Sequence, residues 1–283
     1  MNVKHTINLI KELSKYTKYN PEFFVRLVLL ESWNCLKGKT KLKFFEKNDF
    51  KFKTLLNKNF CFCTPYGKFM ASSIDGWYAM QSNYEKYTQE IFNKNYQKYK
   101  NEKNKIFLDI GANIGRYTIL NALRRYKVYA FEPAEPIFKQ LKRNVELNNL
   151  HNIILIPQGL SDRGDESEFE YFEGFEGSSR IGIQKDELSK YAKVLKVRTK
   201  KLDDVVKEYD INTDKIRLIK IDVEGHEYKV IKGGINTFKR VKNVDITMEI
   251  WDSNPNKEKT LKLMKKLGFK HEQISKDDWH FWR

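Results

Sequence analysis

The sequence predicts an α/β protein built on an open, mostly parallel sheet that ends in an antiparallel hairpin. From residue 105 onward, short apolar runs alternate with stretches of helical periodicity, and strands joined by helices pair in parallel through right-handed crossovers. The last two apolar runs, 269–274 and 279–282, are joined only by residues 275–278, too short a connection for a parallel crossover. These two strands should therefore pair antiparallel.

The first hundred residues are expected to form an N-terminal extension. Residues 1–60 show mainly helical periodicity, and Pro21 suits the first turn of a helix over 23–33. Residues 60–80 alternate aromatic and small side chains, which predicts a β-hairpin, and a helix is predicted over 84–96. We divide the chain into a helical and β-ribbon cap, 1–100, with substrate or oligomer contacts as its expected role, and a main domain, 101–283.

The main domain is expected to hold a seven-stranded sheet. Its strands are predicted at residues 106–110, 128–131, 153–157, 216–222, 244–250, 269–274 and 279–282. Helices are predicted at residues 116–125, 135–148, 202–209, 227–239 and 256–267. Residues 163–200 form an insertion, with extra strands expected in EFEYF and KVLKVRT around a glycine-rich stretch.

The net charge of +16, from 53 basic and 37 acidic residues, fits nucleic acid, an anionic membrane surface or an acidic substrate. Lysine is spread along the whole chain, so a compositional bias explains the charge better than a dedicated patch. No apolar run approaches the ~18 residues of a membrane-spanning helix, and no signal peptide is expected. The sequence leaves the oligomeric state open.

The three cysteines are Cys35, Cys61 and Cys63. An odd number does not suit a disulfide framework, and the spacing of the last two does not suit a zinc site. A reducing, cytoplasmic location is therefore expected.

The segment IFLDIGANIG, residues 106–115, joins the first strand of the main domain to a helix through a loop. The dinucleotide fingerprint fails here, because Asn113 and Arg116 occupy its second and third glycine positions, and no P-loop string occurs in the chain. The remaining pattern is the methyltransferase loop D-x-G-x-G-x-G, with Asn113 in place of the middle glycine. Asparagine tolerates the left-handed backbone that this turn requires.

This loop fits S-adenosylmethionine (SAM), which carries no phosphate and needs close backbone approach from Gly111 and Gly115. Glu132 closes the next strand, where a carboxylate accepts the ribose hydroxyls of a nucleoside. Asp109 has the alternative role of a local turn acid, and Glu132 that of a surface strand end. The expected cofactor is SAM.

A second constellation, KIDVEGHE at residues 220–227, follows the strand predicted at 216–222. Ligands lie outside the carboxyl ends of strands in open α/β sheets, so Asp222, Glu224 and His226 should project near the cofactor. Three roles are open: a metal site, general acid/base work, or capping of the next helix by Glu224 and Glu227. We favour acid/base work, because a helix N-terminus lowers the pKa of a histidine. No metal is expected, since the remaining histidines are isolated.

With both constellations in hand, the chain resembles the FkbM family of SAM-dependent methyltransferases. FLDIGANIGRYT (107–118), FEP (131–133) and KIDVEGHE carry the resemblance; TPYGKF (64–69), Tyr84-Glu85 and GLSD (159–162) match more weakly. The resemblance covers residues 60–283. It implies a Rossmann-like class I methyltransferase fold and O-methylation of a hydroxyl on a sugar, glycan or glycolipid.

The resemblance also implies roles for individual residues. Leu160 would pack on adenine, with Ser161 or Asp162 near its exocyclic nitrogen, and Tyr66 and Glu85 would close the site. The residues expected to bind the cofactor are Asp109, Gly111, Ala112, Asn113, Gly115, Glu132, Pro133, Leu160, Ser161 and Asp222. The residues expected to act in catalysis are Asp222, His226 and Glu224.

Aromatic residues of the extension, Tyr66, Phe69, Trp77 and Tyr78, are expected to offer a face on which a sugar ring stacks; their alternative role is cap core. An RNA-modifying methyltransferase is the alternative function, motivated by the net charge. A scaffold without turnover is a third possibility, against which the intact loop and Glu132 argue. The expected partner is a small-molecule or glycan acceptor.

Overall fold

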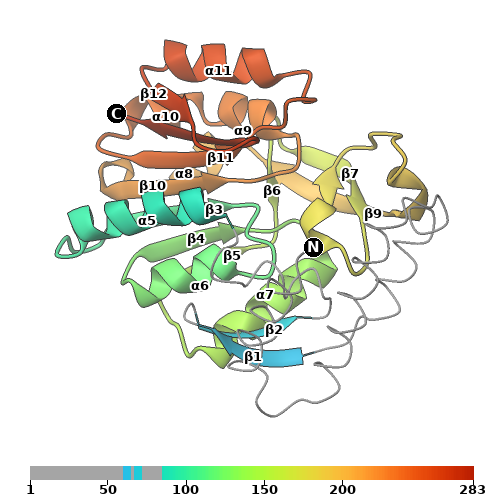
Figure 1. The fold of residues 1–283 in the computed structure, drawn as a ribbon, viewed down its shortest axis with the longest axis horizontal. Helices are drawn as coiled ribbons and strands as arrows, with labels where there is room; N and C mark the ends of the chain where they lie inside the picture. The colour runs from blue at the N-terminus through green and yellow to red at the C-terminus, as the bar shows by residue number, and fades with distance from the viewer. Residues whose placement is uncertain (1–59, 65–66, 72–84) are drawn as a thin grey trace, which may run out of the picture.

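A computed structural model describes residues 60–64, 67–71 and 85–283 (Figure 1). The helices predicted within residues 1–59, and Tyr66, Trp77 and Tyr78, lie outside the described residues. The predicted hairpin is confirmed: β1 (Phe60–Thr64) pairs antiparallel with β2 (Gly67–Ala71). No helix among the described residues is long and apolar enough to cross a bilayer.

The predicted seven-stranded sheet is confirmed, in the order β12-β13-β11-β10-β3-β4-β5. Its neighbours pair in parallel from β11 to β5, whereas β13 is antiparallel to both β11 and β12. The strands are β3 (Ile106–Ile110), β4 (Lys127–Phe131), β5 (Ile153–Ile156), β10 (Ile216–Ile221), β11 (Asp245–Glu249), β12 (Lys270–Gln273) and β13 (Asp278–Trp282). The strand order reverses direction beside β3, which places a ligand crevice at its carboxyl end.

Helices cover both faces of this sheet (Figure 1). They are α5 (Lys86–Tyr99), α6 (Arg116–Leu123), α7 (Glu135–Leu147), α8 (Leu202–Glu208), α9 (Glu227–Gly233), α10 (Ile235–Arg240) and α11 (Lys257–Lys266). Alternate side chains of β3 enter different cores: Phe107 packs in the cluster that includes residues of α5, α6 and α7, whereas Ile106 and Leu108 pack in the cluster with residues of α8 to α11. Both faces of β3 are therefore buried.

The single helix predicted over residues 227–239 is wrong, because Gly234 separates α9 from α10. Gly234 has φ −118° and ψ 18°, outside the helical region. A side chain at Gly233 would lie 2.0 Å from the carbonyl oxygen of Ser161, so glycine there lets the end of α9 meet the segment after β6. Apolar periodicity continues across this break, which is why the sequence did not show it.

The insertion forms a second, four-stranded sheet in the order β6-β9-β7-β8. The two extra strands expected there are confirmed as β7 (Asp165–Tyr171) and β9 (Lys193–Lys200), which pair antiparallel; β6 (Gly159–Leu160) and β8 (Arg180–Ile181) complete the sheet. Short 3-10 helices lie at η1 (Glu176–Ser178), η2 (Ser189–Tyr191) and η3 (Thr213–Lys215).

Among the described residues of the extension, β2 and α5 both pack against the main domain. Strand β2 lies on α7, where Asn144 Oδ1 accepts a hydrogen bond of 2.7 Å from the Met70 N–H. Helix α5 contacts β10, β11 and β13. Phe69 is fully buried in the core, so the expectation that it stacks on a sugar is wrong. The division of the chain at residue 100 stays a prediction.

Candidate active site

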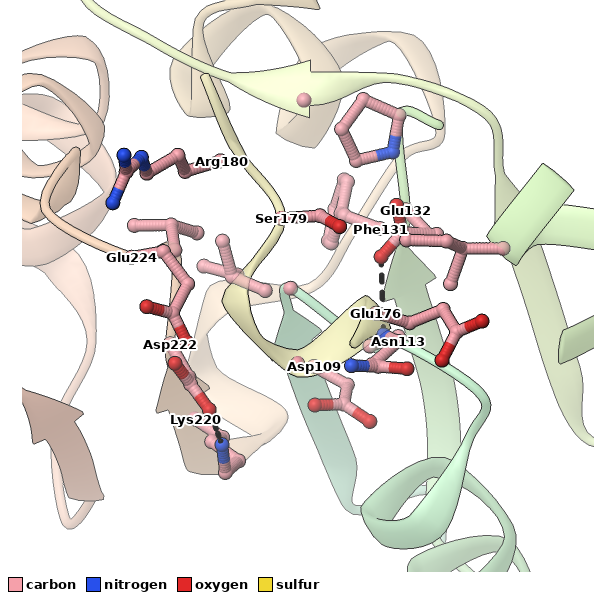
Figure 2. Close-up of a pocket in the computed structure, with 18 of the residues that line it drawn as sticks. Asp109, Asn113, Phe131, Glu132, Glu176, Ser179, Arg180, Lys220, Asp222 and Glu224 are labelled. Atoms are coloured by element: carbon pink, nitrogen blue, oxygen red, sulfur yellow. Dashed lines mark hydrogen bonds and ion pairs between the residues drawn. The ribbon is translucent and has the colours of Figure 1, made fainter. Parts of the chain in front are cut away.

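A cavity of about 360 Å³ lies at the carboxyl ends of β3, β4, β10 and β11 (Figure 2). Its floor is the loop after β3 and its walls are the segments that follow the other strands. The connection from Glu176 to Ile181, which we call the strap, lies across it. The cavity therefore occupies the crevice that the strand order places beside β3.

The loop after β3 brings bare backbone into the cavity. Gly111 has φ 85°, and a Cβ there would lie 1.8 Å from the carbonyl oxygen of Asp222. Asn113 has φ 49°, which confirms that asparagine holds the left-handed turn in place of a glycine. Gly115, with φ 98°, is the N-cap of α6 and does not line the cavity.

Glu132 is buried at the end of β4 and faces the cavity. Its Oε2 accepts a hydrogen bond of 3.1 Å from the Asn113 N–H, and its Oε1 accepts one of 3.0 Å from the Ala134 N–H. Each oxygen keeps a lone pair, so the carboxylate can still accept two hydroxyls. Burial raises the pKa of Glu132 to about 7. The alternative of a surface strand end is wrong.

Asp109 is also buried and lines the cavity. Its Oδ2 accepts a hydrogen bond of 2.6 Å from Thr118 Oγ1, which ties β3 to α6. Its Oδ1 is buried with no hydrogen-bond partner among the described residues. Burial raises the pKa of Asp109 to about 6. One oxygen therefore has a structural role, and the other can accept a hydrogen bond from a ligand.

An ion-paired group stands at the end of β10. Lys220 Nζ lies 2.6 Å from Asp222 Oδ2 and 4.0 Å from Glu85 Oε2, and the Tyr117 hydroxyl donates a hydrogen bond of 2.6 Å to Glu85. Burial raises the pKa of Glu85, while Lys220 lowers it. Attraction to Asp222 and Glu85 outweighs burial and holds the pKa of Lys220 well above its usual range. Lys220 therefore stays charged and orients Asp222.

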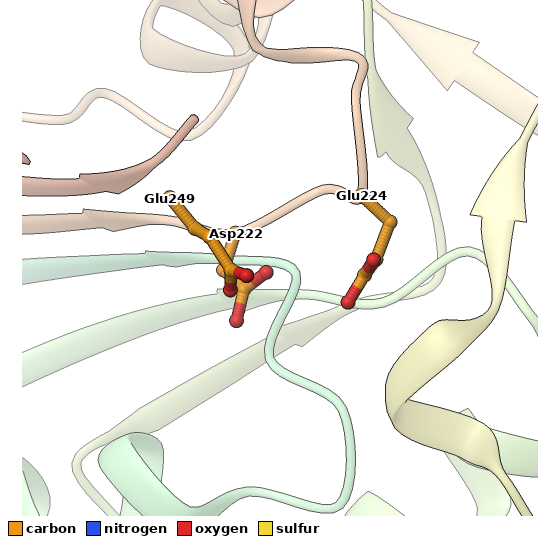
Figure 3. A group of neighbouring side chains, drawn as sticks. All are labelled: Asp222, Glu224 and Glu249. Carbon is orange, nitrogen blue, oxygen red and sulfur yellow. The ribbon is translucent and has the colours of Figure 1, made fainter. Parts of the chain in front are cut away.

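Three carboxyl groups meet beside this pair (Figure 3). Oxygens of Asp222, Glu224 and Glu249 all lie within 4.8 Å of one another, a proximity that no other group of three ligating side chains in the described part of the chain shares. Repulsion from Asp222, together with burial, raises the pKa of Glu249 to about 9. Burial and Asp222 likewise raise the pKa of Glu224. Such a group can share a proton or take up positive charge. The expectation of no metal stays a prediction.

His226 lies outside the cavity lining. Its Nε2 is 3.0 Å from Ser161 Oγ, and burial, assisted by Lys229, lowers its pKa to about 4. The lowered pKa agrees with expectation, but burial causes it and the ring does not face the cavity. Glu227 accepts a hydrogen bond of 2.9 Å from the Gly225 N–H, just before α9.

The cavity brings together most of the residues that the sequence nominated, and their roles stay predictions. Ser161 and Asp162 do not line it; Asp162 pairs with Lys232 at 2.8 Å. The nominated residues that line it are Glu85, Asp109, Gly111, Ala112, Asn113, Glu132, Pro133, Leu160, Asp222 and Glu224.

Sequence reasoning missed Lys220, Glu249, Trp251 and the strap. Glu249 ends the strand predicted at 244–250, so its place at a strand terminus beside β10 was an available signal. The strap offered none. Arg180 anchors it. The Arg180 side chain is only 3% exposed; its Nε lies 2.7 Å from Glu170 Oε2 and its Nη2 lies 2.7 Å from Asp186 Oδ2.

These features fit SAM. The glycine loop would admit its amino-acid portion, and Glu132, which follows β4, would accept hydrogen bonds from its ribose hydroxyls. Asp109 offers a buried acceptor, and the surrounding carboxyl groups suit a positively charged sulfonium.

Comparison with known proteins supports this assignment. Residues 109–271 match the Methyltransferase FkbM domain. The chain is 31% identical over 194 residues to Methyltransferase sdnD of Sordaria araneosa, covering 59% of this chain and 74% of that protein. It is 26% identical over 141 residues to the Hexuronic acid methyltransferase AglP of Haloferax volcanii, covering 50% of this chain and 54% of that one.

Among solved structures, the SAM-dependent methyltransferase from Agrobacterium tumefaciens superposes with a TM-score of 0.48 at 6% identity, over 80% of this chain and 70% of that one. The family match spans more than half of the chain and includes both the glycine loop and the segment after β10. The chain is therefore a SAM-dependent methyltransferase and belongs to the FkbM methyltransferase family.

Proposed function

We propose that this enzyme methylates a hydroxyl oxygen of a sugar, glycan or glycolipid, with Asp222 as the proton acceptor. The observation that carries the proposal is the position of Asp222. Its backbone N–H donates to the Ile110 carbonyl at 3.0 Å, beside the loop after β3, and the residue lines the cavity. A relative acts on a hexuronic acid, according to its name, which supports a sugar acceptor.

Bound SAM supplies an electrophilic methyl group on a positively charged sulfur. The acceptor hydroxyl would take up this methyl group as the carbon–sulfur bond breaks, the thioether S-adenosylhomocysteine would leave, and the hydroxyl proton would pass to a carboxylate oxygen of Asp222. Lys220 holds that carboxylate in place by their ion pair of 2.6 Å. The enzyme mainly aligns the reacting atoms, and a base in contact with the hydroxyl adds on the order of 10²–10⁴-fold.

The RNA-modifying alternative, the cytoplasmic location and the absence of a metal stay predictions. Only the net charge of +16 favours RNA, and the carboxyl groups of the cavity do not attract a polyanion.

The test incubates the enzyme with methyl-labelled SAM and separate pools of glycans, glycolipids and RNA. Label in the glycan or glycolipid pool is expected. Asp222→Asn should lower turnover by about 10²–10⁴-fold, with little change in SAM affinity by calorimetry. Asp252→Asn is the matched control, because Asp252 is exposed and pairs with Lys257. Label entering RNA alone, or full turnover by Asp222→Asn, would contradict the proposal.

A further inference from the structure

Two carboxyl groups stand side by side where β10 and β11 end. These strands are parallel neighbours, and Ile221 is in register with Met248. The next residue along the chain is an acid in both places, Asp222 after one and Glu249 after the other. Adjacent strands lie about 5 Å apart and register partners point to the same face of the sheet. Both side chains therefore reach the cavity together, as Figure 3 shows.

Each of these two carboxyl groups is fixed through one of its oxygens. Lys220 Nζ lies 2.6 Å from Asp222 Oδ2. The Trp251 Nε1–H donates a hydrogen bond of 2.8 Å to Glu249 Oε1. Among the hydrogen bonds between described residues, none engages Asp222 Oδ1 or Glu249 Oε2. Both groups are therefore held in place, and each keeps one oxygen for a ligand.

The spacing and chemistry of the two groups suit a pair of neighbouring hydroxyls. Their oxygens lie within 4.8 Å of each other. Hydroxyls on adjacent ring carbons of a sugar are close enough for each to reach one of these oxygens at the ordinary hydrogen-bond length of about 2.7 Å. Repulsion from Asp222, together with burial, raises the pKa of Glu249 to about 9, so near neutral pH Glu249 is a carboxylic acid. A carboxylic acid both donates and accepts hydrogen bonds, as a hydroxyl does.

The charge of the cavity does not identify the acceptor, so its hydrogen-bonding groups carry the argument. Lys220 balances Asp222, and Arg116 also lines the cavity. Glu224 completes the group of three carboxyl groups, but its backbone has φ 54° and no hydrogen bond between described residues fixes its side chain. Glu249 is therefore the better-positioned partner of Asp222.

Resting on the proposed function, we propose that the acceptor is a vicinal diol: Asp222 takes the proton of the hydroxyl that is methylated, and Glu249 binds the hydroxyl on the adjacent carbon. Glu249 is then a specificity-determining residue, and Trp251 is a positioning residue that acts through it. A sugar without the second hydroxyl leaves the partly buried Glu249 without a ligand partner. A site built to bind a hydroxyl discriminates strongly against the analogue that lacks it.

The test uses methyl-labelled SAM with the methyl glycosides of glucose, galactose and mannose and with their monodeoxy analogues, after nuclear magnetic resonance has located the methylated position. Removing one hydroxyl adjacent to that position should lower kcat/KM by about 10–100-fold, whereas removing a remote hydroxyl should have little effect. We call this ratio of parent to adjacent-deoxy sugar the diol preference.

Four variants relate the diol preference to Glu249. Glu249→Leu should abolish it, because an apolar side chain does not distinguish the two sugars. Glu249→Gln, which keeps a donor and an acceptor, should retain most of it. Trp251→Phe removes the N–H that fixes Glu249 and should lower it in part. Asp252→Asn, exposed and paired with Lys257, should leave it unchanged. SAM affinity, measured by calorimetry, should stay the same in all four.

If wild type methylates the adjacent-deoxy sugar as fast as its parent, the inference is overturned. It is also overturned if Glu249→Leu slows both sugars equally, which is the behaviour of a merely structural residue. Both results leave the proposed function standing. If Glu249→Leu does not fold, the wild-type comparison and Trp251→Phe still decide the question. If no glycoside, glycan or glycolipid accepts label while the enzyme binds SAM, the proposed function fails and this inference fails with it.

Discussion

At the scale of single residues, the cavity is lined by carboxyl groups whose burial disfavours the ionised form. Asp109 and Glu132 have raised pKa values because both are removed from water, and each keeps acceptor capacity toward the cavity. Burying an anion costs stability unless a ligand compensates it. The protein without SAM is therefore expected to be less stable than its complex, so SAM binding should raise the free energy of unfolding.

Glu132→Gln tests this cost. The folded-state pKa of about 7 lies above the ordinary value of 4.5, so the stability that Glu132 contributes is fully present below pH 4.5 and is lost as pH rises through 7. Wild type should lose up to about 3 kcal/mol between pH 4.5 and 8 that the variant does not lose. Urea unfolding across this range measures the difference. SAM affinity should fall by about 10–100-fold in the variant. If the free energies of unfolding of wild type and Glu132→Gln depended on pH in the same way, the argument that Glu132 is a buried carboxyl group with a raised pKa would be contradicted.

Gly111→Ala tests the close approach between the loop after β3 and the carbonyl oxygen of Asp222. The added Cβ would lie 1.8 Å from a backbone oxygen at φ 85°, so we expect a loss of several kcal/mol of stability and of SAM binding. Gly182→Ala is the matched control: φ is 93°, but no atom lies within 4 Å of the new Cβ. It should cost about 1 kcal/mol. Denaturant unfolding of the two variants separates the cost of the steric contact from that of backbone strain. Equal losses in the free energy of unfolding would show that backbone strain alone causes the effect.

His226 shows what the sequence could not determine at this scale. The spacing in KIDVEGHE places it near Asp222, but Glu224 and Gly225 both have positive φ, at 54° and 100°. The chain therefore turns before His226 and directs it to Ser161, away from the cavity. Asp222 and Glu132 were placed correctly because they directly follow strands, whose ends the sheet brings together.

At the scale of elements, the insertion is what completes the cavity. Its second sheet supports the strap, which includes β8, and buried Arg180 ties the strap to Glu170 of β7 and to Asp186. The main strands and helices were predicted because buried apolar runs and helical periodicity mark them directly. The strap is irregular and polar, so its path depends on the ion pairs of Arg180, which local periodicity does not encode.

Arg180→Met is expected to loosen the strap. It leaves Glu170, at 1% exposure, as a buried carboxylate without its partner, a change that typically costs about 3–5 kcal/mol. SAM affinity should fall with stability. Adding Glu170→Gln should restore most of the stability, because the unpaired charge is gone, but only part of the SAM affinity, because the strap still lacks its anchor. Thermal unfolding measures the stability, and calorimetry the SAM affinity, of the four proteins of this double-mutant cycle: wild type, Arg180→Met, Glu170→Gln and the double variant. Additive losses would show that the two side chains act independently.

At the scale of the whole molecule, the domain extends beyond the residues that the family match covers. The match begins at residue 109, yet α5 packs on the sheet through Asn95. The Asn95 side chain donates hydrogen bonds of 2.7 Å to the Arg217 carbonyl and to Asp245, and accepts one of 2.6 Å from Tyr126. One buried amide therefore connects the extension to β10, β11 and the segment before β4.

Asn95→Ala should lower the free energy of unfolding by about 2–4 kcal/mol, since three partners lose their hydrogen bond in a buried place. Asn93→Ala on the same helix is the control, because Asn93 is exposed and bonds only to Arg124 among the hydrogen bonds described. It should change stability by less than about 0.5 kcal/mol. Urea denaturation compares them, and a small loss for Asn95→Ala would mean that α5 is not integral to the domain.

The close packing of Gly111 on the carbonyl of Asp222 has a mechanical consequence. The turn proposed to hold the methyl donor and the residue proposed to accept the proton approach each other through main-chain atoms, with no side chain between them to flex. The loop after β3 and Asp222 therefore keep a fixed spacing. Any movement that lets reactants enter the cavity must then come from the strap that lies across it. We expect hydrogen exchange to be slow along the amides of 109–112 and 221–223, and fast along 174–182.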